Sequence, residues 1–202
     1  MNVDISELTK LLVVNEIIKF GDFELKSGKR SWFYVDLRLI SSYPSVFRYT
    51  IECYKSLLNK IDNFDAVAGV AVAGVPFSAV LGFVLNKPSL IVRPQSKQHG
   101  LKKLVEGFLP QNREVVLIDD LITTGGSKIP GIKALRQENY IVKNLIVLID
   151  RSQGIIEDLE KSEINLVSFG KIEDIFEECL KEDIDWISEE DKEIIKTNWV
   201  SK

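Results

Sequence analysis

Hydrophobic positions in the first sixty residues follow two different periods. Asp4 stands just ahead of an amphipathic run and has a glutamate three residues later, which predicts a capped helix reaching about residue 19. Two short runs, 22–26 and 32–37, predict strands that are joined by a turn. A helical period then begins at Pro44, a residue that suits the first turn of a helix.

From residue 65 onward, short runs rich in Val and Ile alternate with helical segments. Apolar strands separated by helices indicate a mostly parallel sheet that is covered on both faces, so the expected fold class is α/β. Strands are predicted at 66–70, 89–92, 115–118, 141–149 and 164–169, and helices at 74–85 and 125–138.

Composition and charge narrow the function classes. The chain has 202 residues and a net charge of −4, which gives no reason to expect nucleic-acid binding. No apolar stretch approaches the roughly 20 residues of a membrane span, and the N-terminus does not read as a signal peptide. Cys53 and Cys179 are far apart, which favours free thiols in a reducing cytoplasm. The single histidine excludes a His-based metal cluster.

The strongest chemical signal is the segment 115–127. Four apolar residues predict a buried strand, and Asp119 and Asp120 stand at its C-terminal end. A Thr-Thr-Gly-Gly-Ser loop then opens a helix, and its backbone N–H groups and hydroxyls can bind a phosphate. Because the two carboxylates would repel that phosphate, they suit hydroxyl groups, magnesium or a cationic transition state. A sugar that carries a phosphate satisfies both halves of the segment.

This segment closely resembles the motif with which type I phosphoribosyltransferases bind phosphoribosyl pyrophosphate (PRPP). The resemblance implies that Asp119 and Asp120 are catalytic and that the loop holds the 5′-phosphate of PRPP. The phosphate-binding residues would be Thr123, Thr124, Gly125, Gly126 and Ser127.

Two earlier segments resemble other parts of the same family. The small-residue turn after the strand at 66–70 is similar to the family's pyrophosphate loop, and its implied PRPP-binding residues are Ala71, Val72, Ala73 and Gly74. Residues 93–100 are similar to the mobile catalytic loop, in which Arg93, Lys97 and His99 would contact the pyrophosphate. In the family this loop usually comes from the neighbouring subunit. The resemblance therefore implies a homodimer in which residues 93–107 reach the neighbouring site.

Two further segments narrow the resemblance to the orotate phosphoribosyltransferases. Residues 23–28 are similar to a signature whose lysine, here Lys26, reaches the active site. Residues 149–154 are similar to a signature whose arginine, here Arg151, binds the orotate carboxylate, a task that suits the fork of an arginine. Phe33 and Tyr34 are candidate base contacts, and core packing is an equally good reading of both rings.

The resemblance implies a type I phosphoribosyltransferase fold. We expect one domain over residues 1–202, with a small N-terminal hood mainly in 1–40, a core at about 41–170 and acidic C-terminal helices in 171–202. The implied reaction joins orotate to PRPP in pyrimidine biosynthesis, in the cytoplasm, with Mg²⁺ bound through PRPP and no metal ligand assigned to the protein. Two alternatives stay open: a phosphoribosyltransferase for uracil or a purine, and a PRPP-binding regulator without catalysis.

Overall fold

The computed structural model describes residues 2–25, 28–93, 104–126, 128–152 and 154–200. The chain forms two compact units. The core unit is Ile51–Phe169, and the hood unit combines Met1–Thr50 with Gly170–Lys202. The hood unit thus joins segments from the two ends of the chain.

A six-stranded sheet forms the centre of the core unit. Its strand order is β5-β4-β3-β6-β7-β8. Strand β3 pairs in parallel with β4 and with β6, and β6 pairs in parallel with β7, which confirms the mostly parallel sheet. At the edge of this sheet, β4 pairs with β5 in the antiparallel direction. The strands are β3 (Ala66–Val70), β4 (Ser89–Val92), β5 (Val105–Glu106), β6 (Val115–Ile122), β7 (Asn144–Asp150) and β8 (Asn165–Lys171).

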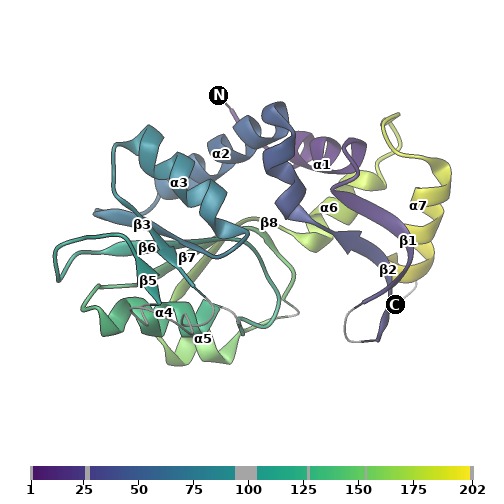
Figure 1. Cartoon of the computed structure of the whole chain (residues 1–202). Coiled ribbons are helices and arrows are strands. Elements are labelled where there is room, and N and C mark those ends of the chain that lie inside the picture. Colours follow the sequence, from purple (N-terminus) through teal and green to yellow (C-terminus); the bar gives the residue numbers. More distant parts are fainter. Residues whose placement is uncertain (1, 26–27, 94–103, 127, 153, 201–202) are drawn as a thin grey trace. The chain divides into compact units, whose positions relative to one another are not determined.

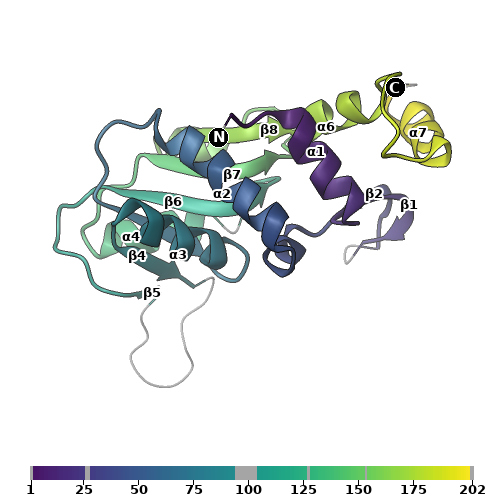
Figure 2. The same ribbon diagram turned by 90° about the horizontal axis from the view of Figure 1, so that it is seen from above.

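Helices cover both faces of this sheet. Helix α3 (Gly74–Leu85) lies on one face, and α4 (Lys128–Gln137) and α5 (Glu157–Lys161) lie on the opposite face (Figure 1). Figure 2 shows β6 and β7 running side by side. Every residue of β3 is buried, as expected for a strand with helices on both sides.

Several predicted bounds were wrong in a way that affects the site. Strand β6 continues to Ile122 instead of ending at residue 118, so both aspartates lie within the strand. Helix α4 begins at Lys128 instead of 125, because Gly125 adopts a left-handed backbone (φ +78°) that no helix contains. Strand β7 begins at Asn144 instead of 141. The short strand β5 was not predicted, since two residues carry no periodicity.

The hood unit is built on an antiparallel hairpin of β1 (Ile18–Glu24) and β2 (Arg30–Val35). Asp4 caps α1 (Ile5–Val14) by accepting a hydrogen bond from the backbone N–H of Glu7, as predicted. The helix ends before residue 19, because the chain turns left-handed at residue 16 and then enters β1. The remaining elements are η1 (Leu37–Ser42), α2 (Pro44–Leu58), which continues into the core unit, α6 (Ile172–Cys179), α7 (Glu189–Ile195) and η2 (Lys196–Val200).

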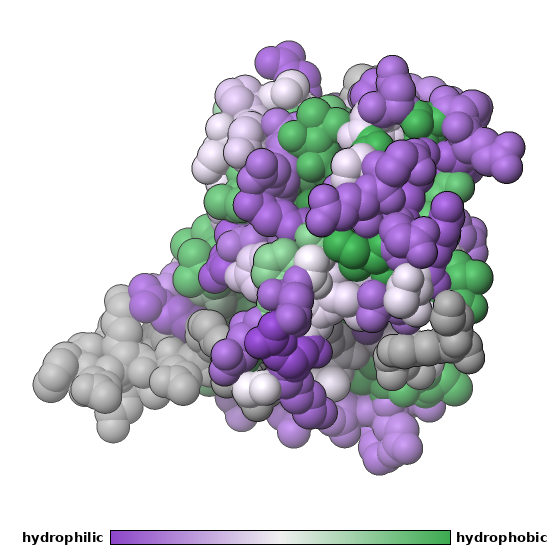
Figure 3. All heavy atoms as spheres, turned by 90° about the vertical axis from the view of Figure 1, so that its right-hand side faces the viewer, coloured by the Kyte–Doolittle hydropathy of each residue, from purple (hydrophilic) through white to green (hydrophobic). Residues whose placement is uncertain are grey.

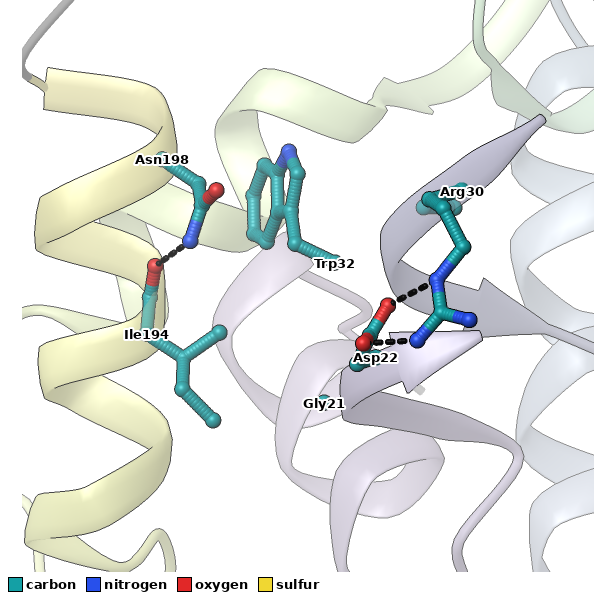
Figure 4. Close-up of a pocket in the computed structure, with 7 residues that line it drawn as sticks. Gly21, Asp22, Arg30, Trp32, Ile194 and Asn198 are labelled. Carbon is teal, nitrogen blue, oxygen red and sulfur yellow. Dashed lines mark hydrogen bonds and ion pairs between the residues drawn. The ribbon is translucent and has the colours of Figure 1, made fainter. Parts of the chain in front are cut away.

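An aromatic cluster fills the interior of the hood unit. Phe176 of α6 lies 4.7 Å from Trp32 and 5.1 Å from Phe33, measured between ring centroids. Beside it, a groove of about 510 Å³ lies between the hairpin and the C-terminal helices, with Trp32, Asp22 and Arg30 in its lining (Figure 4). On the face drawn in Figure 3, hydrophobic residues form separate patches with hydrophilic residues between them.

The remaining sequence expectations concern cysteines and membranes. Cys53 and Cys179 are both free and buried, in agreement with the expectation of free thiols. Among the described residues, no helix has both the length and the apolar character that crossing a membrane requires.

Candidate active site

The two adjacent carboxylates of β6 have different surroundings. Asp119 is buried, with only 3 % of its surface exposed, whereas Asp120 is partly exposed. One Asp119 carboxylate oxygen, Oδ1, accepts a hydrogen bond from the backbone N–H of Asp120 at 2.9 Å. Asp120 Oδ1 in turn accepts from the backbone N–H of Leu121 at 2.7 Å. Asp120 is therefore the carboxylate that a ligand can approach.

A lysine from the next helix pairs with Asp119. The Nζ of Lys128, the first residue of α4, lies 2.6 Å from Asp119 Oδ2. Burial raises the pKa of Asp119 to about 7, the Lys128 ammonium opposes that rise, and the Asp120 carboxylate adds to it. A buried carboxylate without this cation would bind its proton still more tightly.

The backbone around Asp119 is fixed from the opposite face of the sheet. The hydroxyl of Tyr54, on α2, donates a hydrogen bond to the Asp119 carbonyl oxygen at 2.7 Å. Gly74 begins α3 so close to β6 that a Cβ there would collide with the Ile118 carbonyl oxygen. This close approach explains why a glycine opens the helix. Together these contacts set the position of the strand at the twin aspartates.

The loop after β6 has the features of a phosphate site. Thr123, Thr124 and Gly126 are exposed, and Gly125 supplies the left-handed turn that a side chain would strain. The two threonines line a groove of about 340 Å³, whose other wall is formed by Ser152 and residues 154–158 after β7. The structure thus brings the predicted phosphate loop and the predicted orotate signature together at neighbouring strand ends, where open α/β sheets bind ligands.

Arg151 follows directly after β7. Its backbone N–H donates to the Ile122 carbonyl oxygen at 2.8 Å, which joins this segment to the end of β6. Its side chain is partly buried, and burial lowers the pKa of the guanidinium. A partly dehydrated cation interacts more favourably with an anionic ligand than a fully exposed cation does.

The predicted pyrophosphate loop connects β3 to α3 at the same edge of the sheet. Ala71 donates its backbone N–H to the Val92 carbonyl oxygen at 2.7 Å, and its peptide bond to Val72 is cis. The Val72 side chain is 80 % exposed, whereas Gly74 is buried. Small residues here leave the backbone of residues 71–73 accessible to a ligand.

Comparisons with known proteins place the chain in a family. The Phosphoribosyl transferase domain family matches residues 46–182. An orotate phosphoribosyltransferase of Pyrobaculum islandicum is 44 % identical over 137 residues, which cover 68 % of this chain and 70 % of the relative. One from Sulfolobus acidocaldarius is 32 % identical over 189 residues, 94 % of each chain. The crystal structure of orotate phosphoribosyltransferase from Aeropyrum pernix matches with a TM-score of 0.78 and 36 % identity, covering 85 % of this chain and 97 % of that one.

The chain belongs to the orotate phosphoribosyltransferase family. Membership confirms the type I phosphoribosyltransferase fold that the motifs implied. The roles of individual site residues remain predictions.

Other residues that the orotate phosphoribosyltransferase resemblance singled out have varied surroundings. Arg93 Nε lies 3.1 Å from Glu106 Oε1, across the pairing of β4 with β5. Phe33 packs in the aromatic cluster of the hood unit, and Tyr34 is 39 % exposed beside Phe23. The predictions for Lys26, Lys97, His99 and Ser127 fall outside the described residues.

Sequence reasoning missed two residues of this site, Lys128 and Tyr54. Lys128 carried one signal that could have been read: a lysine directly after the phosphate loop stands at a helix start, where cations are disfavoured. Tyr54 carried none, because its place in an amphipathic helix predicts only core packing.

Proposed function

We propose that the protein transfers the 5-phosphoribosyl group of PRPP to orotate, giving orotidine 5′-monophosphate and pyrophosphate in pyrimidine biosynthesis. The observation that carries the proposal is the groove at the ends of β6 and β7. There the exposed threonines of the candidate phosphate loop face Ser152 and residues 154–158, which follow Arg151 in the chain. Relatives that match nearly the whole chain are named for this reaction.

Residues in and beside the groove would bind different parts of the two substrates. Backbone N–H groups and hydroxyls of the loop 123–127 would bind the 5′-phosphate. The accessible carboxylate of Asp120 would accept hydrogen bonds from the ribose hydroxyls and favour positive charge on the sugar ring. Arg151 would bind the orotate carboxylate and turn the attacking ring nitrogen toward C1 of the ribose.

Pyrophosphate must leave as the C1–O bond breaks. The backbone of residues 71–73 would bind it, and Arg93, Lys97 and His99 would place positive charge against it. Within the described residues no group of three His, Cys, Asp or Glu side chains could hold a metal ion by itself. Magnesium would enter this site as an ion carried by PRPP oxygens, where it would neutralise charge on the leaving group.

We further propose that the protein acts in the cytoplasm as a homodimer in which the loop 93–107 serves the neighbouring site. Large apolar side chains support an interface between copies: Phe83 on α3 is 87 % exposed and Phe108 is 83 % exposed. Exposed apolar side chains mark a protein–protein contact surface where they form a contiguous patch.

One assay tests the function. Purified protein is incubated with PRPP, magnesium and one base at a time, namely orotate, uracil, adenine, hypoxanthine or guanine, and pyrophosphate release is measured. Release with orotate alone supports the proposal. Release with a different base reassigns the enzyme, and binding of PRPP without release for any base identifies a regulator.

Arg151→Ala tests the carboxylate assignment. We expect KM for orotate to rise roughly tenfold to a hundredfold, because a charge-assisted pair with a carboxylate contributes about 1.5–3 kcal/mol. KM for PRPP should change far less. Arg151→Lys keeps the charge but loses the fork, so it should recover only part of the affinity. Equal increases in both KM values would refute the assignment.

A further inference from the structure

Lys128 occupies a place that is unfavourable for a cation. It is the first residue of α4, where the helix dipole is positive, and its side chain is only 10 % exposed. Taking an ammonium out of water is costly unless an opposite charge compensates it. The compensating charge is the carboxylate of Asp119, whose Oδ2 lies 2.6 Å away.

Both carboxylate oxygens of Asp119 and its backbone carbonyl oxygen have partners. Its Oδ1 accepts from the Asp120 backbone N–H, its Oδ2 faces Lys128, and its carbonyl oxygen accepts from Tyr54. With 3 % of its surface exposed, Asp119 has little freedom to turn toward a sugar. The two aspartates therefore differ in whether they can reach a ligand, although the sequence alone gives no reason to distinguish them.

We propose that Lys128 is a positioning residue, whose ammonium favours the ionised form of the Asp119 carboxylate and fixes it beneath the ribose site. Asp119 then acts as a buried negative charge that favours the cationic sugar, and Asp120 meets the ribose hydroxyls. This inference rests on the proposed function, which supplies the sugar whose charge Asp119 would stabilise.

Titratable groups from three elements lie around Asp119, and two of them, Lys128 and Asp120, act on the protonation of its carboxylate. Lys128 on α4 favours the ionised form, and Asp120 on β6 opposes it. Burial and the two carboxylates raise the pKa of Tyr54, on α2, well above its usual value, so this phenol stays neutral. Removing Lys128 would therefore raise the pKa of Asp119 above about 7 and extend the protonated form past neutral pH.

The first experiment compares Lys128→Met with Lys133→Met, which makes the same change at an exposed position of α4. The profile of kcat/KM for PRPP is measured from about pH 6 to about pH 9. We expect Lys128→Met to lose about tenfold at neutral pH and to recover as the pH rises, with its acidic limb displaced upward by about one unit or more. Lys133→Met should overlay the wild type. An equal loss at every pH would refute the proposal.

A second comparison keeps the proposal testable if Lys128→Met folds poorly. Lys128→Arg retains a cation and should keep the acidic limb of the wild type. The double variant Lys128→Met/Asp119→Asn contains no unpaired buried charge, so it should fold well. We expect its kcat to stay low because the fixed charge is gone. Recovery of wild-type kcat in the double variant would show that the pair is only structural.

Unfolding without substrate separates this inference from the proposed function. A carboxylate whose pKa is raised by folding destabilises the protein as pH rises toward its folded-state pKa. The deficit of Lys128→Met relative to Lys133→Met should therefore widen from about pH 6 to about pH 9. A constant deficit would contradict the ion-pair role, even if the wild type transferred phosphoribose to no base.

Discussion

Two ion pairs of this protein show how burial changes the energetic role of a contact between an aspartate and a cation. Asp119 and Lys128 pair in the core unit with side chains that are 4 % and 10 % exposed. Asp22 and Arg30 pair in the hood unit, across the hairpin of β1 and β2, with side chains that are 68 % and 64 % exposed. In Figure 4 the Arg30 guanidinium meets both Asp22 oxygens, so the pair is joined at two points.

The number of contacts alone would suggest that the exposed pair stabilises the protein at least as much as the buried pair. The Arg30 guanidinium holds the pKa of Asp22 below its usual range, whereas burial raises the pKa of Asp119 to about 7 despite its cation. Water solvates Asp22 and Arg30 whether or not they meet. Asp119 and Lys128 depend on each other because burial has removed the water that would otherwise stabilise each charge.

Among the substitutions that test this comparison, Asp119→Asn is expected to lower the stability of the protein most. The substitution removes the carboxylate that lies 2.6 Å from the buried Lys128 ammonium, and losing one partner of a buried ion pair typically costs roughly 3–5 kcal/mol. Urea unfolding measures the change. The matched variant Asp120→Asn should keep the wild-type stability within about 1 kcal/mol, because its side chain is partly exposed. It should nevertheless lower kcat by roughly a hundredfold or more. Equal stability losses in both variants would remove the distinction between the two aspartates.

A smaller effect is expected from Tyr54→Phe. The ring remains packed against Phe77, but the Asp119 carbonyl oxygen loses its donor inside the core. An unsatisfied buried acceptor costs about 1–3 kcal/mol, measurable as a lower urea midpoint at constant slope. Tyr43→Phe provides a control, since its ring is 36 % exposed. A wild-type midpoint for Tyr54→Phe would mean that this hydrogen bond does not help to hold β6.

The smallest effect is expected from Asp22→Asn. Both partners of this pair are solvated, so the thermal midpoint at neutral pH should equal that of the wild type within error. The lowered pKa of Asp22 fixes the sign of any residual effect. Stability from the pair is present above the ordinary pKa of Asp and is lost as pH falls through the folded-state pKa, so the two proteins should converge in acid. A large midpoint shift at neutral pH would show that the exposed pair contributes more than its solvation allows.

The core unit could be predicted well because its sequence signals are local. The apolar runs that became β3 and β4, and the small-residue turn that became the start of α3, matched the observed bounds. A strand buried on both faces has few alternatives, since no other element accepts so short and so continuous an apolar run. The predicted end of β6 was wrong because the strand continues past its apolar residues through the polar Asp119 and Asp120.

The candidate site was only partly predictable, for a physical reason. The sequence by itself determined the fold class, the candidate phosphate loop and the family, because each depends on residues that are adjacent in the chain. Only the tertiary structure decided that Asp119 is buried, that Lys128 neutralises it and that Tyr54 holds its backbone. Those properties depend on how much water remains around a charge after residues from α2, α4 and β6 have packed together, and no periodicity along the chain records that.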